Sequence, residues 1–244
     1  MFIKCKIISF KLFIIISILL CGCPGPPEYD FKVLTLYGEY GSEPGQFNTP
    51  MGVITRRVSD SISSSLFIAD YGNNRVQIIT PATYLHSPDT ITIIKEEISD
   101  TTILLWPKSV TVTQSIMNDF NSPISDNPCI YVADSKNNRI MVYNIDGVFQ
   151  FQWGSLGNDP GQFNSPTDID IDFEGNIYVA DSGNHRIQVF DTLGNFIRMW
   201  GGMGSDTGQF ISPMSLVVCY NGFDSGNFRY IGVSDYGNDR LQAF

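Results

Sequence analysis

The feature that most constrains this chain is an internal repeat. The pattern Asp-x-x-Asn-x-Arg occurs four times, each time between two short apolar runs. Successive motif aspartates are 64, 47 and 54 residues apart, which indicates one structural unit repeated with insertions. Units of this size bury their apolar faces by stacking against their neighbours. The motif residues are Asp70, Asn73 and Arg75; Asp134, Asn137 and Arg139; Asp181, Asn184 and Arg186; and Asp235, Asn238 and Arg240.

Two further elements recur around each motif. A Gly-Gln-Phe segment that ends in proline precedes it at 45–50, 161–166 and 208–213, and has decayed in the second unit to residues 101–107. A Trp-Gly pair follows the motif at 153–154 and 200–201. The runs between these elements are short, β-branched and aromatic, and glycine, asparagine and aspartate separate them. Each unit therefore predicts four short strands joined by tight turns.

In this order the elements resemble the NHL repeat family over residues 31–244. The resemblance implies an all-β fold, a β-propeller of four-stranded antiparallel blades, commonly six-bladed, that serves as a platform for proteins, RNA or ligands. Four blades are recognised in this sequence. Residues 31–38 resemble the outer strand at 196–201 and are expected to complete the last blade. A four-bladed ring and a part of a larger, typically six-bladed propeller both stay open.

The first residues predict an export signal. Lys4, Lys6 and Lys11 precede an apolar run at 12–20. As a helix this run would reach about 14 Å, well short of a bilayer core of about 30 Å. Residues 1–22 therefore fit a signal peptide better than a membrane span.

The end of that signal resembles a bacterial lipobox. Its sequence is Leu20-Cys21-Gly22-Cys23, which predicts lipid attachment at Cys23, with Cys21 as the rival position and an ordinary secretory signal as the alternative. Residues 23–30 would form the lipidated cysteine and a short tether. We therefore expect an exported protein whose membrane contact is this lipid anchor, in the bacterial cell envelope, at the outer membrane or the cell surface.

The charge of the chain bears on its partners. The formal net charge is −10, and removal of residues 1–22 leaves 12 basic against 25 acidic residues, a balance of −13. A field of this sign repels phosphate backbones. Nucleic acid is therefore not expected as a partner.

The repeated polar motif is interpreted as structural. Each motif aspartate ends a strand, where its carboxylate is expected to accept backbone N–H groups of the following turn. Gly72, Gly183 and Gly237, with the asparagines that follow them, are expected at positive φ. Each motif arginine is expected to pair with a motif aspartate. Because an active site is normally singular and this set occurs once per unit, no catalytic residue is assigned.

One acidic run departs from the repeat. Asp168, Asp170 and Asp172 alternate along a strand, which puts them on one face. Carboxylates on one face supply the hard oxygen ligands that Ca²⁺ prefers, and a site at the central channel is one reading. The other reading is acidic side chains that are simply solvated. Calcium is the only cofactor that the sequence suggests.

The preferred hypothesis for function is a non-catalytic binding or scaffold module for an unknown protein or small ligand. Two alternatives remain. The first is a propeller enzyme, a lyase or hydrolase with its site at the channel. The second is a nucleic-acid platform, which the acidic charge opposes.

Overall fold

The computed structural model describes residues 38–56, 65–80, 90–94, 103–113, 128–172, 174–220 and 229–244. The expected signal peptide, Cys23, the tether and residues 31–37 of the strand expected at 31–38 lie outside these ranges. Among the described residues, no helix combines the length and the apolar character needed to cross a bilayer.

The third blade shows how the repeat folds. Its strands are β9 (Pro166–Ile171), β10 (Ile177–Asp181), β11 (Arg186–Phe190) and β12 (Phe196–Gly201), paired antiparallel in the order β12-β11-β10-β9. The β9–β10 turn contains Gly175 and the β11–β12 turn contains Gly194, and their φ angles are 85° and 82°. Glycine adopts this conformation without steric cost. The four strands lie where the repeat predicts them.

The other three sheets repeat this plan. The first has β1 (Pro50–Arg56), β2 (Ser65–Asp70), β3 (Arg75–Thr80) and β4 (Thr90–Ile94); the second has β5 (Pro107–Val112), β6 (Cys129–Asp134), β7 (Arg139–Asn144) and β8 (Phe149–Trp153). The fourth has three strands in the described residues, β13 (Pro213–Tyr220), β14 (Arg229–Asp235) and β15 (Arg240–Ala243). A one-turn 3-10 helix follows the second strand of each sheet, at Tyr71–Asn73 (η2), Ser135–Asn137 (η3), Ser182–Asn184 (η4) and Tyr236–Asn238 (η5).

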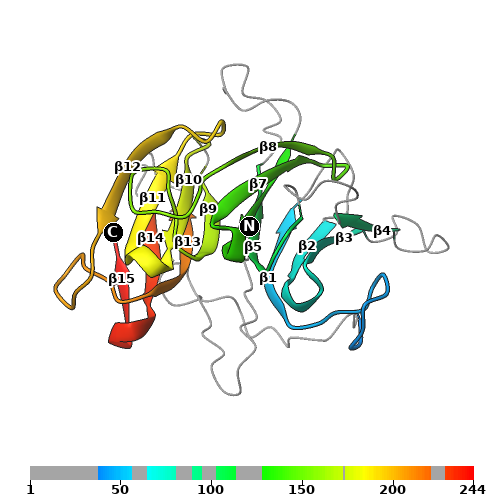
Figure 1. Cartoon of the computed structure of the whole chain (residues 1–244), viewed down its shortest axis with the longest axis horizontal. Coiled ribbons are helices and arrows are strands. Elements are labelled where there is room, and N and C mark those ends of the chain that lie inside the picture. The colour runs from blue at the N-terminus through cyan, green and yellow to red at the C-terminus, as the bar shows by residue number, and fades with distance from the viewer. Residues whose placement is uncertain are drawn as a thin grey trace, which may run out of the picture.

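The sheets are blades of a β-propeller, fanned side by side from the first, cyan blade to the last, red one (Figure 1). The inner strands contact one another in chain order, β1 with β5, β5 with β9, and β9 with β13. No comparable contact joins β1 to β13 among the described strands. The described blades therefore form an arc with two free ends, blade 1 and blade 4.

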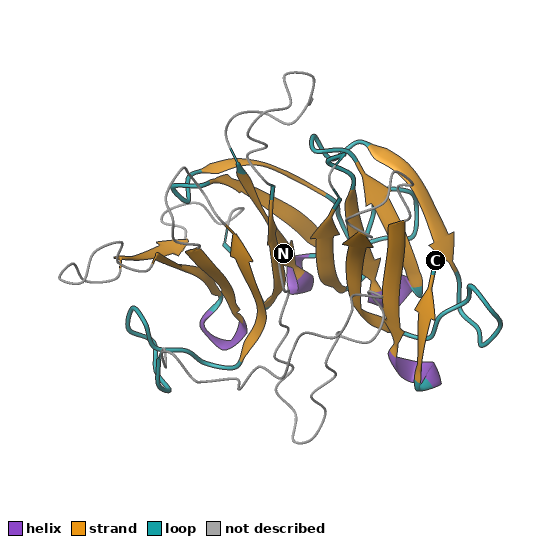
Figure 2. Ribbon diagram, turned by 180° about the vertical axis from the view of Figure 1, so that it is seen from behind, coloured by secondary structure: helices purple, strands orange, loops and turns teal. Residues whose placement is uncertain are grey.

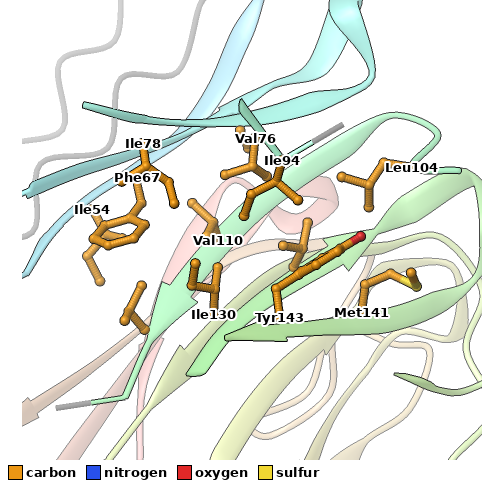
Figure 3. Packing of buried hydrophobic residues seen from close by; sticks show 13 residues of the cluster. Ile54, Phe67, Val76, Ile78, Ile94, Leu104, Val110, Ile130, Met141 and Tyr143 are labelled. Atoms are coloured by element: carbon orange, nitrogen blue, oxygen red, sulfur yellow. The ribbon is translucent and has the colours of Figure 1, made fainter. Parts of the chain in front are cut away.

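The core lies between the blades. At the first junction, Ile54, Phe67 and Val76 of blade 1 pack against Val110 and other apolar side chains of blade 2 (Figure 3). One such cluster fills each of the three junctions. The second strands of blades 2 and 3 are therefore buried on both faces, and β10 is buried at every position. Because Phe47, Phe163 and Phe210 recur once per unit, we expect all three in the core between blades. Phe163 and Phe210 are fully buried in these clusters, whereas Phe47 is half-buried.

Gly201 is a sensitive point in this packing. Its φ is 116°, and a Cβ there would lie 2.8 Å from both the His185 carbonyl oxygen and the Phe210 ring. Gly202 also has positive φ, 128°, but a Cβ there would meet nothing within 4 Å. We expect Gly201→Ala to lower the free energy of unfolding by about 2–4 kcal/mol, and Gly202→Ala by about 1 kcal/mol. Urea denaturation of both variants measures the difference, and equal losses would contradict the steric argument.

Candidate functional site

The motif residues form one buried polar cluster in each blade. In blade 3, Asp181 Oδ2 accepts hydrogen bonds from Arg186 Nε at 2.7 Å and Asn184 Nδ2 at 2.9 Å. Asp181 is fully buried and Arg186 nearly so. The same ion pair, at 2.7–2.8 Å, joins the motif aspartate and arginine of every blade, which confirms the expected pairing.

Each cluster holds the segment that leads into its blade. We call residues 38–49, 103–106, 154–165 and 201–212 the leading loops. Arg186 donates to the carbonyl oxygens of Asn158, Asp159 and Gln162 at 2.6–3.1 Å. Arg75 and Arg240 bind three carbonyls of their own leading loops in the same way. The guanidinium thus satisfies a loop backbone that has no strand partner.

One member of the cluster was missed by the sequence reasoning. A glutamine two residues after the arginine donates from Nε2 to the motif carboxylate at 3.0–3.2 Å in three blades. The same Nε2 donates to a leading-loop carbonyl at 2.6–2.7 Å. These residues are Gln77, Gln188 and Gln242. The Arg-x-Gln pattern that identifies them repeats visibly in the sequence, while Met141 stands at this position in blade 2.

The structure corrects two expectations about the turn. The second carboxylate oxygen does not bind the following turn; Asp181 Oδ1 accepts the Asn164 N–H of the leading loop at 2.7 Å, and the 3-10 helices have no side-chain cap. The positive φ angles belong not to the motif glycines but to the next-but-one residues, Asn74, Asn138, His185 and Asp239. The motif glycines instead give room to the leading loop, because a Cβ at Gly183 would lie 2.5 Å from Asn164 Cγ.

The positive-φ residues link neighbouring blades. Asn138 Oδ1 accepts the N–H of Ser165, the residue before the proline that opens the next blade, at 2.8 Å. Asn74 and His185 accept the equivalent N–H groups of Trp106 and Ser212 at 2.9 and 3.0 Å. His185 is thus an acceptor within a blade junction and belongs to no catalytic set in the described residues.

The cluster carboxylates differ in pKa between an inner and a terminal blade. Burial raises the pKa of Asp134, against hydrogen bonds from Asn137 and Arg139 that would lower it. At Asp235 burial acts in the same direction, but hydrogen bonds from Asn238, the Ile211 N–H and Arg240 outweigh it and the pKa is lowered. The Arg240 side chain is 30% exposed whereas its counterparts are 6–10% exposed. Blade 4 therefore holds its cluster in a wetter setting.

The acidic run on β9 is buried, so the picture of acids on a solvated face is wrong. Asp168 accepts hydrogen bonds from Ser109 Oγ of blade 2 at 2.6 Å, and from Ser215 Oγ and the Leu216 N–H of blade 4 at 2.9 and 2.7 Å. Asp170 accepts the Val218 N–H at 2.9 Å. The two carboxylates thus connect β9 to β13 by hydrogen bonds, and Asp168 also connects β9 to β5.

Asp172 serves a different purpose. It accepts the backbone N–H groups of Glu174 and Asn176 at 2.9 and 2.8 Å and the Tyr178 hydroxyl at 3.2 Å. Asp168 and Asp170 alternate along β9, whereas Asp172 follows the end of this strand, and the oxygens of the three aspartates are directed to different partners. In the part of the chain that the structure describes, no group of three or more His, Cys, Asp or Glu side chains is placed to hold a metal ion.

Two exposed side chains that depart from the repeat, Trp106 and Lys136, meet at the first junction. Trp106, with φ 57°, takes a position held elsewhere by threonine or serine, and Lys136 takes that of the motif glycines. The Lys136 ammonium lies 4.3 Å from the centroid of the Trp106 ring. The Tyr71 ring stacks on the Trp106 ring at 5.7 Å. We call these three residues the junction cluster. It lies on the turn face, the end of the sheets that carries the four 3-10 helices (Figure 2).

Comparisons with known proteins bear on the fold. The profile of a family described as a 6-bladed beta-propeller matches residues 123–199. A search of curated proteins finds no match. Similar solved structures include proteins of unknown function from Bacteroides thetaiotaomicron (16% identity, 73% of this chain and 44% of that one, TM-score 0.48) and Bacteroides caccae (10%, 80% and 63%, 0.49). Virginiamycin B lyase from Staphylococcus aureus is also similar (16%, 80% and 55%, 0.46). The chain spans about half the length of these proteins.

Substitution of Asp168 separates a structural role of this side chain from calcium binding. Asp168 is a buried acceptor that joins three blades. We therefore expect Asp168→Asn to lower the free energy of unfolding by about 2–4 kcal/mol. Addition of millimolar Ca²⁺ is expected to leave the melting temperature of the unmodified protein unchanged. Asp146→Asn, at an exposed turn position, is the control and should change little. A melting temperature that rises with Ca²⁺, and no longer rises in Asp168→Asn, would favour the calcium site instead.

Proposed function

We propose that this propeller is a non-catalytic interaction module of the NHL-repeat type, held at the cell envelope by a lipid on Cys23. The observation that carries the proposal is how the polar residues are used. The chemistry that looks reactive in sequence, an acid, an amide and a base, is buried in four equivalent clusters that hold the leading loops. Motif side chains that are buried in this way stabilise the fold and do not contact a substrate.

The surface residues that differ between blades support the same proposal. A rigid repeat scaffold presents such positions for recognition, while the repeated positions maintain the fold. The junction cluster concentrates an exposed tryptophan, which is 43% exposed, with a tyrosine and a lysine. Tryptophan and tyrosine are enriched at the centres of protein interfaces. We therefore place the contact with a protein or small ligand at the turn face around Trp106 and Lys136.

The described residues offer little to the enzyme alternative. The carboxylates that set blade 3 apart are buried as backbone acceptors, and His185 accepts an N–H within a junction. A general base must reach a proton of the substrate. The acidic charge of the chain likewise opposes a nucleic-acid partner.

The anchor is tested by paired cysteine variants in the bacterial envelope. We expect Cys23→Ser to move the protein from the detergent-rich to the aqueous phase in a detergent partition assay, because the acyl chains are lost. Cys21→Ser, two residues away, should partition as the unmodified protein does. If Cys23→Ser still partitions with detergent, the lipid assignment is wrong, and if only Cys21→Ser is released, the site is Cys21.

The contact face is tested by site-specific photo-cross-linking in cells. A photoreactive residue at position 136 is expected to give discrete adducts, whereas one at Leu193, 70% exposed in the β11–β12 turn, should give none of the same mass. Trp106→Ala should weaken the adduct at 136 at least several-fold, without loss of the cooperative thermal transition. Equal adducts at 136 and 193, or none at either position, would contradict a specific turn-face contact.

A further inference from the structure

Met199 brings a sulfur atom against the polar cluster of blade 3. It lies on the outer strand β12 and is 45% exposed. Arg186 Nη1 donates to the Asn158 carbonyl oxygen at 2.6 Å and to the Met199 Sδ at 3.4 Å. A thioether sulfur is only a weak acceptor. The guanidinium that binds the buried Asp181 carboxylate therefore has one N–H that a better acceptor could use.

Blade 2 has such an acceptor at the equivalent position. Arg139 Nη1 donates to the Gln152 Oε1 at 2.8 Å. Gln152 of β8 is paired across the sheet with Met141 of β7. Met199 of β12 is paired in the same way with Gln188 of β11. The two blades thus hold one methionine and one glutamine in the same cross-strand pair, in opposite order, and the outer member faces the arginine in both.

Oxidation would make the Met199 side chain resemble glutamine. In methionine sulfoxide, two carbons lead from the backbone to a sulfur that carries one oxygen and one methyl group. In glutamine, two carbons lead to a carbon that carries one oxygen and one amide nitrogen. Addition of this oxygen converts an apolar side chain into a polar one. The sulfoxide oxygen of residue 199 therefore corresponds to the Gln152 Oε1 that accepts from Arg139 in blade 2.

We propose that Met199 is a modification site, oxidised by hydrogen peroxide to a sulfoxide that accepts a hydrogen bond from Arg186 and stabilises the polar cluster of blade 3. A lone pair of the sulfur attacks one peroxide oxygen, so that an S–O bond forms and the O–O bond breaks. The departing hydroxide takes the proton of the transferred oxygen and leaves as water. The sulfur loses two electrons and the peroxide is reduced. Because Met199 is exposed, its side chain is open to peroxide in the folded protein.

Other methionines provide contrasts within the same chain. Met203 is 73% exposed, and among the described residues no arginine donates to its sulfur. Met141 is fully buried. Within the described ranges, Met199 is the exposed methionine whose sulfur accepts an N–H from a charged group. Oxidation at Met199 should therefore change the stability of the fold in a way that oxidation at Met203 does not.

The proposal is tested by peroxide treatment followed by thermal melts. The sample is the chain from residue 23 onward with Cys23→Ser, which contains all the described residues, and peptide mass spectrometry measures the oxygen added at each methionine. We expect oxidation at Met199 to raise the melting temperature by about 2–4 °C, because a charge-assisted hydrogen bond to oxygen replaces a weak one to sulfur. A methionine sulfoxide reductase should reverse the rise. Met141 should stay unmodified in the folded protein.

Three variants separate Met199 from other oxidised side chains. Met199→Leu should show no rise on treatment, whereas Met203→Leu, the matched control, should show the full rise. Met199→Gln should melt higher without treatment by a similar amount, because it supplies the oxygen found at position 152 of blade 2. A melting temperature that is unchanged or lower once Met199 is oxidised would overturn the proposal. So would a rise that persists in Met199→Leu, or a Met199 that stays unmodified while Met203 is oxidised.

Discussion

A buried carboxylate that accepts hydrogen bonds at both oxygens is the interaction on which the rest of this propeller depends. One oxygen of Asp181 accepts from Arg186 and Asn184, and the other accepts from the backbone of the leading loop. An unpaired buried carboxylate would be costly, so the arginine, the asparagine and the loop must be in place together. The cluster thus couples the hairpin of β10 and β11 to the irregular segment before β9. That segment ends at Pro166, where the inner strand β9 begins.

Because the motif side chains are used inside the blades, only other positions are open to a contact with a partner. The motif side chains that repeat in every blade form hydrogen bonds inside it, so the contact surface that we propose uses positions that change from blade to blade. Trp106 and Lys136 are such positions, and they coincide with the unit whose leading loop has lost the Gly-Gln-Phe pattern. Asp168 and Asp170 also break the repeat, but they point inward and replace missing strand partners of β13. A residue that departs from the repeat can therefore belong to a surface or can form hydrogen bonds inside the propeller. Its burial shows which of the two applies.

Stacking order explains why the two ends of the arc differ from its middle. A propeller blade has no core of its own; each apolar face is covered by a neighbour. Blades 2 and 3 have both faces covered, and their second strands are accordingly apolar up to the motif aspartate that ends each of them. Blade 4 has smaller and more polar residues toward its open side, with Gly232 and Ser234 where blade 3 has Tyr178 and Ala180. This side of blade 4 is therefore less apolar than the equivalent side of blade 3.

Much of this architecture follows from the sequence alone. The repeat determined the described strands of each unit, the pairing of the motif aspartate and arginine, and the burial of Phe163 and Phe210. These features depend on local alternation and on residues close along the chain. The Arg-x-Gln pattern was equally visible, although its role was not recognised. Tertiary structure alone decided which atoms the second carboxylate oxygen binds, which turn residue takes positive φ, and that Asp168 and Asp170 face the interior. These features depend on contacts with a leading loop or a neighbouring blade. Spacing along a chain specifies which side of a strand a residue occupies, but only packing decides what covers that side.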